Sequence, residues 1–389
     1  MKRTTCKTLL LLTASLFLLA SCKGGGSENV TPAPPPGNNG GNTNDSIPFI
    51  FREKTGGYSC YRIPAIVRTK TGVLLAFAEA RKNNCKDEGD IDLLVKRSTD
   101  GGKTWSNPIM VWDDGANTCG NPVPVLDEQT GRLHLVMTWN LGEDNIGAIN
   151  AGTSKDTRRV FVTSSDDEGL TWASAKEITK DVKKPGWAWY GTGPCHGIQL
   201  KRGTYAGRLV IPCDYMSLKT TDSPSRDSAH VIYSDDHGQS WKLGGVANKD
   251  RGAESTVAEL SNGQLMLNIR NSAGGARLVA NSTDGGASWL PVRADYTLVE
   301  PICQGSLLSY KQWLFFSNPA STARENMTIR LSTDDGNNWS KSCKIYSGPS
   351  AYSDIVMLSD TEIAIFYEAG YKKPYEGIAY KVIPVTDFK

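Results

Sequence analysis

One eight-residue pattern recurs five times along this 389-residue chain, and it constrains the fold more than any other feature. The pattern is Ser-x-Asp-x-Gly-x-(Thr/Ser/Asn)-Trp. Its copies begin at Ser98, Ser165, Ser234, Ser282 and Ser332. A run typical of a β-strand leads into each copy, such as IDLLVKRS for the first and RRVFVTSS for the second. Five copies in the same relation to a strand indicate an internal structural repeat.

Each copy has the chemistry of a tight turn between two strands. The Asp can accept hydrogen bonds from the backbone, the Gly supports a positive φ, and the Trp ends the turn with a large apolar surface. Successive copies lie 48 to 69 residues apart, and a four-stranded propeller blade needs about 40–50 residues plus its loops. Residues 47–389 would hold six blades, one of them without the pattern. The sequence therefore predicts an all-β fold, a six-bladed β-propeller, with the turn joining the two outer strands of a blade.

The first 46 residues have the composition of processing and linker segments. A basic start precedes an almost wholly apolar stretch from Leu9 to Leu19, as in a secretory signal. The following Ala-Ser-Cys22 resembles the lipobox of bacterial lipoproteins, which implies a signal peptide over 1–21 and a lipid on Cys22; the alternative is an ordinary signal with an incidental Cys. Residues 22–46 are rich in Gly, Pro and Asn, so we expect a flexible tether. The sequence predicts an exported lipoprotein of the periplasm or cell surface, bound to a membrane through this anchor alone.

Charge and cysteine content exclude several function classes. The formal charge of +2 does not indicate a nucleic-acid partner. Seven cysteines remain beside Cys6 and Cys22, and an odd number in an exported protein leaves at least one free thiol. No Cys-x-x-Cys pair is present, so no zinc site is predicted. The pairing of the cysteines stays open.

The eight-residue repeat is identified as the Asp box, and the chain resembles the sialidase family from about residue 49 to its end. This resemblance implies a six-bladed propeller with its active site at the centre of one face. Asp boxes also occur in unrelated propellers, so any activity must be argued from other residues.

Sialic acid has a carboxylate on its anomeric carbon, and a planar cation such as a guanidinium binds a carboxylate best. Taken singly, any arginine here would be assigned to a surface ion pair. However, Arg62 in Tyr-Arg-Ile-Pro, Arg270 in Leu-Asn-Ile-Arg-Asn and Arg324 in Asn-Pro-x(4)-Arg resemble the arginine triad of the family. Arg330 lies close to the third position.

The same resemblance implies an acid–base catalyst in a loop, six residues after a further arginine. Arg81 would then contact the C4 side of the sugar or its carboxylate, and Asp87 would be the acid–base group. Without the family pattern, Glu88, Asp90 and Asp92 would compete equally for this role.

The nucleophile follows from the carboxylate of the substrate. An Asp or Glu attacking beside it would meet like-charge repulsion, which a neutral phenol avoids, and sialidases are the recognised case of a tyrosine nucleophile among glycosidases. The family motif Ala-Tyr-Ser-Asp places this role on Tyr352, and Glu-Ser-x-Val-x-Glu places its base on Glu254. Glu259, at the end of the same motif, is the rival base.

Two further residues complete the pocket that the resemblance implies. Glu368, in Phe-Tyr-Glu, would orient the first arginine. Asn121, in Gly-Asn-Pro, would contact the ring substituents of the sugar. The segment 187–199 is expected to form a pocket wall. Its glycine spacing does not fit dinucleotide binding, so no nucleotide site is predicted there.

The sequence thus predicts a monomeric exo-α-sialidase that needs no metal or organic cofactor and acts on sialylated glycans. It would remove terminal α-linked sialic acids with retention, through a covalent bond to Tyr352. Three alternatives remain: an enzyme of the same fold that transfers sialic acid or forms an anhydro product, a non-catalytic propeller that binds sialoglycans, and a surface adhesion module.

Overall fold

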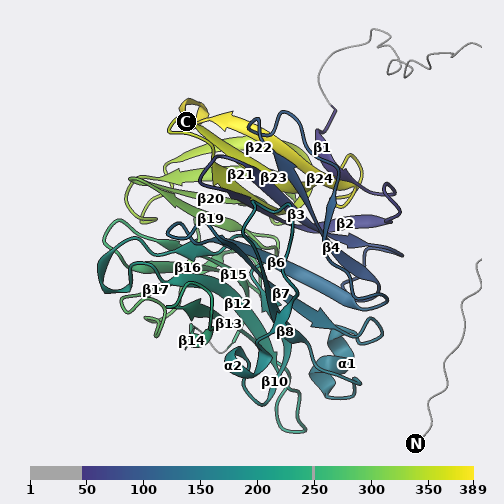
Figure 1. The fold of residues 1–389 in the computed structure, drawn as a ribbon. Coiled ribbons are helices and arrows are strands. Elements are labelled where there is room, and N and C mark those ends of the chain that lie inside the picture. The colour runs from purple at the N-terminus through teal and green to yellow at the C-terminus, as the bar shows by residue number, and fades with distance from the viewer. Residues whose placement is uncertain (1–45, 248–249) are drawn as a thin grey trace, which may run out of the picture. The chain divides into compact units, whose positions relative to one another are not determined.

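The computed structural model describes residues 46–247 and 250–389, which fold into a ring of antiparallel sheets (Figure 1). The predicted signal peptide, Cys22 and the tether up to residue 45 lie outside the described residues. Within the described ranges, no helix is long and apolar enough to cross a membrane.

The strands of the described residues form six blades, as predicted; five have four strands, and in the third the short strand β11 adds a fifth. The first blade contains β2 (Cys60–Arg68), β3 (Leu74–Arg81), β4 (Ile91–Ser98) and β5 (Ile109–Trp112). The second contains β6 (Thr118–Leu126), β7 (Leu133–Asn140), β8 (Arg159–Ser165) and β9 (Lys176–Glu177). The third contains β10 (Trp187–Thr192), β11 (Ile198–Gln199), β12 (Leu209–Ser217), β13 (Asp227–Ser234) and β14 (Lys242–Val246). Two short α-helices, α1 (Ile146–Ala151) and α2 (Thr179–Val182), lie in the connections.

The last three blades include one strand that serves two sheets. The fourth blade is β15 (Gly252–Glu259), β16 (Leu265–Asn271), β17 (Arg277–Ser282) and β18 (Arg293–Asp295). The fifth is β19 (Ser306–Tyr310), β20 (Trp313–Pro319), β21 (Glu325–Ser332) and the first half of β22 (Lys341–Met357). The second half of β22 begins the sixth blade, followed by β23 (Glu362–Ala369), β24 (Gly377–Pro384) and, from the other end of the chain, β1 (Phe49–Arg52).

The Asp boxes connect the third and fourth strands of the first five blades, which confirms the predicted position. In the first box the Asp100 carboxylate accepts hydrogen bonds from the Ser98 hydroxyl at 2.8 Å and the Thr104 backbone N–H at 2.9 Å. Trp105 packs edge-on against Tyr380 of the sixth blade, with ring centroids 5.2 Å apart. Gly102 has a φ of 89°, and a Cβ there would lie 2.1 Å from the Tyr380 ring. The box is therefore a turn and an inter-blade contact at once.

The sixth blade has no Asp box because its outer strand arrives from the N-terminus. β1 pairs antiparallel with β24, with Phe49 opposite Ala379 and Arg52 opposite Gly377. No turn is needed after β24, so no turn motif is present there. The pairing closes the ring.

The strand directions place one set of strand ends at the same face of the ring. Neighbouring strands are antiparallel, so the first strand of each blade begins where the second ends. β3 is buried along its whole length, down to Glu79 and Arg81 at its end. Polar side chains at these ends, such as Arg62, Glu254 and Arg270, therefore gather at one face and build the site described next.

Candidate active site

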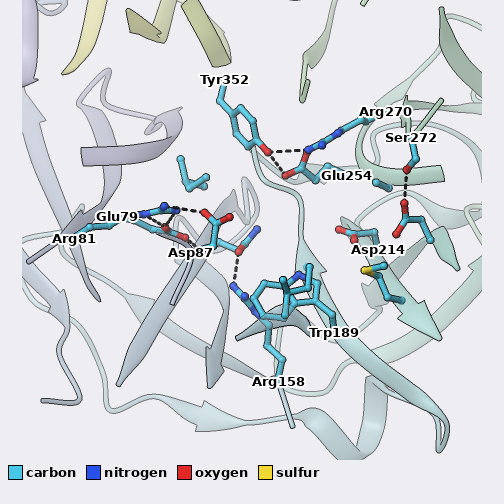
Figure 2. Close-up of a pocket in the computed structure, with 17 residues that line it drawn as sticks. Glu79, Arg81, Asp87, Arg158, Trp189, Asp214, Glu254, Arg270, Ser272 and Tyr352 are labelled. Atoms are coloured by element: carbon cyan, nitrogen blue, oxygen red, sulfur yellow. Dashed lines mark hydrogen bonds and ion pairs between the residues drawn. The ribbon is translucent and has the colours of Figure 1, made fainter. Parts of the chain in front are cut away.

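A pocket of about 300 Å³ opens at this face (Figure 2). Its walls include six of the residues predicted from the sequence, namely Arg81, Asp87, Asn121, Glu254, Arg270 and Tyr352. They come from the first, second, fourth and sixth blades, so residues far apart in the sequence meet here. The expected wall segment 187–199 contributes Trp189 and Gly191.

The three predicted arginines converge on one tyrosine, Tyr352. The guanidinium carbon of Arg62 lies 4.9 Å from the centroid of its ring, and that of Arg324 lies 5.7 Å from it. Arg270 Nη1 donates to the Tyr352 hydroxyl at 3.0 Å. Three cations around one tyrosine form a candidate anion-binding site. Arg270 lines the pocket, whereas Arg62 and Arg324 are not among its wall residues.

The Tyr352 hydroxyl donates a hydrogen bond to Glu254 Oε1, and Glu254 Oε2 accepts one from Arg270 Nη1 at 2.6 Å. Burial raises the pKa of Tyr352 well above its usual value, and the Glu254 carboxylate raises it further, although Arg270 and Arg62 oppose them. The phenol is therefore neutral at rest, and a carboxylate stands ready to accept its proton.

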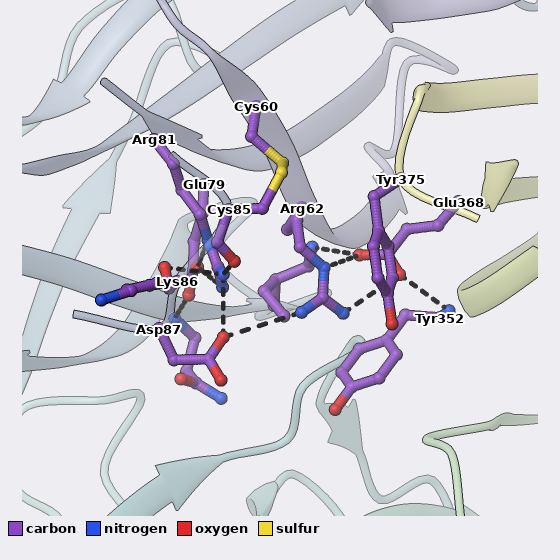
Figure 3. A network of polar contacts seen from close by, with 12 residues as sticks. Cys60, Arg62, Glu79, Arg81, Cys85, Lys86, Asp87, Tyr352, Glu368 and Tyr375 are labelled. Atoms are coloured by element: carbon purple, nitrogen blue, oxygen red, sulfur yellow. Dashed lines mark hydrogen bonds and ion pairs between the residues drawn. A yellow bond between two sulfur atoms is a disulfide. The ribbon is translucent and has the colours of Figure 1, made fainter. Parts of the chain in front are cut away.

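Glu368 is fully buried and fixes the strand segments that hold Arg62 and Tyr352. Its carboxylate accepts hydrogen bonds from Arg62 Nε at 3.0 Å and Nη2 at 3.2 Å, and from the backbone N–H groups of Ile63 at 3.0 Å and Tyr352 at 3.1 Å (Figure 3). Ile63 has a φ of 60°, a strained conformation for a β-branched residue. The bond from Glu368 helps to hold this kink, which directs Arg62 into the site.

Asp87 lies in the loop between β3 and β4, with 60% of its side chain exposed. Its Oδ1 is 2.8 Å from Arg81 Nη1 and 3.6 Å from Arg62 Nη1. Burial raises the pKa of Asp87, but the guanidinium groups of Arg81 and Arg62 lower it more, so the net pKa lies below the usual value. In the unliganded protein, Asp87 is thus an ionised carboxylate that faces the arginine cluster.

Arg81 is buried, and most of its hydrogen bonds are made to Glu79 and to the loop that contains Asp87. It pairs with Glu79 Oε2 through Nε at 3.0 Å and Nη2 at 2.6 Å. Its Nη1 donates to the backbone carbonyls of Cys85 at 2.6 Å and Lys86 at 2.8 Å. The predicted contact of Arg81 with the substrate stays a prediction, while its contact with the loop of Asp87 is direct.

Asn121 lies between Glu79 and a buried arginine that the sequence analysis did not single out. Its backbone N–H donates to Glu79 Oε1 at 2.7 Å, and its Oδ1 accepts from Arg158 Nη2 at 2.6 Å. The guanidinium of Arg158 stacks on Trp189 at 3.8 Å. Arg158 directly precedes β8, where an arginine looks like any residue that flanks a strand.

Asp214 and Tyr375 were missed as well. Asp214 lines the pocket from β12, and burial raises its pKa well above its usual value. The Tyr375 hydroxyl accepts a hydrogen bond from Arg324 Nη1 at 2.5 Å, and Arg62 lies 4.3 Å from its ring. The only signal for Asp214 in the sequence was its place directly after the strand-like run LVIPC. Tyr375 lies in a polar loop and belongs to no motif.

The competing residues lie elsewhere. Glu259 ends β15, five residues and about 16–17 Å along the strand from Glu254, and it accepts hydrogen bonds from the backbone of Lys201 and Arg202 at 2.9 Å. Arg330 donates to Asn318. The acidic rivals of Asp87 have other surroundings too, since Asp90 pairs with Lys82, Asp92 with Tyr58, and Glu88 is not part of the pocket wall.

One disulfide joins Cys60 and Cys85. The other cysteines of the described residues are free: Cys119, Cys195, Cys213, Cys303 and Cys343. The same part of the chain contains no group of three or more His, Cys, Asp or Glu side chains that could hold a metal ion.

Fold and site together define a class of protein, a six-bladed Asp-box propeller with an anion-binding pocket around a tyrosine–glutamate pair. Residues 72–365 match the family model described as a BNR repeat-like domain. The chain is 33% identical to an exo-alpha-sialidase of Arthroderma benhamiae, over 81% of this chain and 79% of that protein. The solved structure of Hadza microbial sialidase Hz136 superposes with a TM-score of 0.78 at 31% identity, covering 87% of this chain and 68% of that one.

A sialidase of Bacteroides fragilis is also 33% identical, over 80% of this chain. The chain belongs to the sialidase family. It spans 60% of the length of the Bacteroides fragilis protein.

Proposed function

We propose that this chain is an exo-α-sialidase that hydrolyses terminal α-linked sialic acids of glycoconjugates with retention of configuration. One observation supports this most directly: Tyr352 donates to Glu254, while Arg270 bonds its hydroxyl and Arg62 and Arg324 lie at its ring. A nucleophile, its base and a cluster of three cations thus meet at one tyrosine. The sialidase names of the relatives support the same substrate class.

In this proposal the C1 carboxylate of the substrate binds to Arg62, Arg270 and Arg324. Arginine pairs with a carboxylate through two parallel hydrogen bonds, and Glu368 holds Arg62 in a fixed orientation for this contact. A hydrogen bond to a charged group contributes about 1.5–3 kcal/mol. The cluster would therefore select acidic sugars and place C2 beside Tyr352.

The first chemical step joins Tyr352 to C2 of the sugar. The neutral phenol can approach a carbon that has a carboxylate without like-charge repulsion. As its oxygen attacks C2, its proton passes to Glu254, and Arg270 stabilises the negative charge that develops on the oxygen. Asp87, which takes up a proton once the substrate carboxylate binds to Arg62, gives that proton to the glycosidic oxygen while the C2–O bond breaks, and the aglycone leaves as an alcohol.

The second step releases the sugar. Asp87, now a carboxylate, accepts a proton from a water that attacks C2 and breaks the bond to Tyr352, and Glu254 returns the phenolic proton. Two displacements invert C2 twice, so the product keeps the configuration of the substrate.

The opposite end of the pocket would hold the polar substituents of the sugar. Arg158 Nε and Nη1 and Asp214 Oδ1 are buried and have no hydrogen-bond partner within the described ranges. Burial lowers the pKa of Arg158 to about 10, so it stays a donor at neutral pH, and burial raises the pKa of Asp214 well above its usual value. Such groups need partners from a ligand.

The identity and configuration of the first product test this proposal. Proton NMR during hydrolysis of an α-sialoside should show the α-anomer of free sialic acid before mutarotation. The β-anomer would contradict a tyrosyl intermediate. An anhydro sugar or a sialylated acceptor would assign one of the transferring activities, and binding without turnover would assign a sialoglycan-binding propeller.

Removal of the nucleophile gives a second test. Tyr352→Phe should lower kcat for a fluorogenic sialoside by at least about 10³-fold, because the attacking oxygen is lost while the ring packing is kept. Tyr296→Phe is the matched control, since the Tyr296 side chain is 81% exposed and lies outside the pocket. Near-normal turnover by Tyr352→Phe would reject the mechanism.

A further inference from the structure

The loop that holds Asp87 is fixed to the molecule at the residues just before it. Cys85 forms a disulfide with Cys60, the first residue of β2, and Cys60 lies two residues before Arg62 (Figure 3). The carbonyls of Cys85 and Lys86 accept hydrogen bonds from Arg81 Nη1 at 2.6 and 2.8 Å. Both attachments come from rigid strands, β2 and β3.

Beyond these residues the loop has few contacts, of which the main ones are two hydrogen bonds between Gly89 and Thr118 of β6 at 3.1 and 2.8 Å. Asn83, Asn84, Lys86 and Asp87 are exposed, and no member of the hydrophobic core clusters lies between residues 82 and 90. The Lys86 N–H bonds only within the loop, to Asn84 Oδ1 at 2.8 Å. The position of Asp87 therefore depends on the disulfide and Arg81 on its N-terminal side and on the Gly89–Thr118 bonds on its C-terminal side.

The remaining groups of the site are held independently of this loop. Glu368 fixes Arg62 and the Tyr352 backbone from β23, and Arg270 bonds to Tyr352 and Glu254 from β16. Loosening the loop would therefore displace the acid–base group and leave the nucleophile and the arginine cluster in place.

We propose that the Cys60–Cys85 disulfide is a positioning device for the general acid–base residue Asp87, and that its loss removes proton transfer to the leaving group selectively. This inference rests on the proposed function. A dithiol reductant would supply two electrons and two protons, convert the bridge to two thiols and become a cyclic disulfide itself. The loop then gains conformational freedom, and a displacement of about 1 Å can cost about 10²-fold in rate.

The test compares leaving groups. The variant Cys60→Ser/Cys85→Ser is assayed with sialyllactose, whose alkoxide leaving group needs a proton, and with 4-methylumbelliferyl sialoside, whose leaving group is acidic and needs little assistance. We expect kcat/KM to fall by about 10²-fold for sialyllactose and by less than about 3-fold for the aryl sialoside. Native protein treated with dithiothreitol should show the same split, and the double variant should not respond to the reductant.

Cys343→Ser is the matched control, because Cys343 is a free and partly exposed thiol on β22, outside the pocket. It should behave as the native protein with both substrates. Equal losses for both substrates, no loss for either, or unfolding of the native protein on reduction would overturn the positioning role. If the untreated native protein releases no sialic acid from either substrate, the proposed function fails first, and this inference fails with it.

Discussion

Asp87 faces a charge environment that the substrate itself would change. In the unliganded protein its carboxylate lies 2.8 Å from Arg81 and 3.6 Å from Arg62, and both guanidinium groups lower its pKa. A bound substrate would place its own carboxylate on Arg62. Asp87 would then lose part of this attraction and gain a neighbouring negative charge, and both changes raise the pKa of a carboxyl group.

This predicts different pH profiles for the free enzyme and the complex. The pKa of Asp87 should be low in kcat/KM, which reports the free enzyme, and higher by at least about one unit in kcat, which reports the complex. Because the acid must be protonated, kcat should fall above the higher pKa, and KM should rise between the two values. Steady-state profiles with a natural sialoside measure both. Identical values in kcat and kcat/KM would contradict a substrate-induced shift.

Among the single residues of the site, the sequence could predict those that lie in a short motif on a strand. It could not predict those without a motif. Arg62, Glu254 and Tyr352 each lie within a tetrapeptide or hexapeptide that resembles a motif of the family, so the resemblance pointed to single positions. Arg158, Asp214 and Tyr375 have no motif, and their roles depend on which strand ends meet in three dimensions. The pairing of Cys60 with Cys85 was open for the same reason.

The Asp box is the element that holds the outer turn of each of the first five blades. Hydrogen bonds from the hydroxyl and backbone of Thr104, and from Ser98, lower the pKa of Asp100 to about 2. A carboxyl group whose pKa is lower in the folded state stabilises the fold above its unfolded pKa, near 4, and loses that contribution as the pH falls through its folded pKa.

Asp100→Ala should therefore lower the urea midpoint at pH 7, and the difference from the native protein should shrink between about pH 4 and pH 2. Urea unfolding monitored by tryptophan fluorescence at several pH values measures it. Asp222→Ala, at an exposed aspartate of a loop, is the control and should not shift the midpoint. A difference that is constant down to pH 2 would show that the box acts without its charge.

The repeat was enough to predict the number and order of the blades, since each box marks the outer turn of a sheet. It could not show how the sixth blade is completed, because that depends on a pairing between residues more than 300 positions apart. The strand β22 that serves two blades was likewise not visible in the sequence, because no turn motif interrupts or marks it.

At the scale of the whole molecule, the proposed attachment to a membrane depends on Cys22. We expect Cys22→Ala to move the protein from the membrane fraction to the soluble fraction, because a lipid is added to the thiol of this residue in lipoproteins. Fractionation of expressing cells followed by an activity assay measures it, and activity per molecule should not change. Continued membrane association of the variant would reject the anchor.

Ring closure by β1 sets a sharp limit on where the chain can be cut. Because β1 completes the sixth blade through its pairing with β24, a protease that cleaves before residue 46 would leave the ring closed. If Cys22 has the proposed lipid, the same cut would free the ring from the membrane. A cut only a few residues later would remove Phe49–Arg52, leave the β24 edge bare and open the circle. The four residues of β1 thus separate a cut that leaves the ring closed from a cut that opens it.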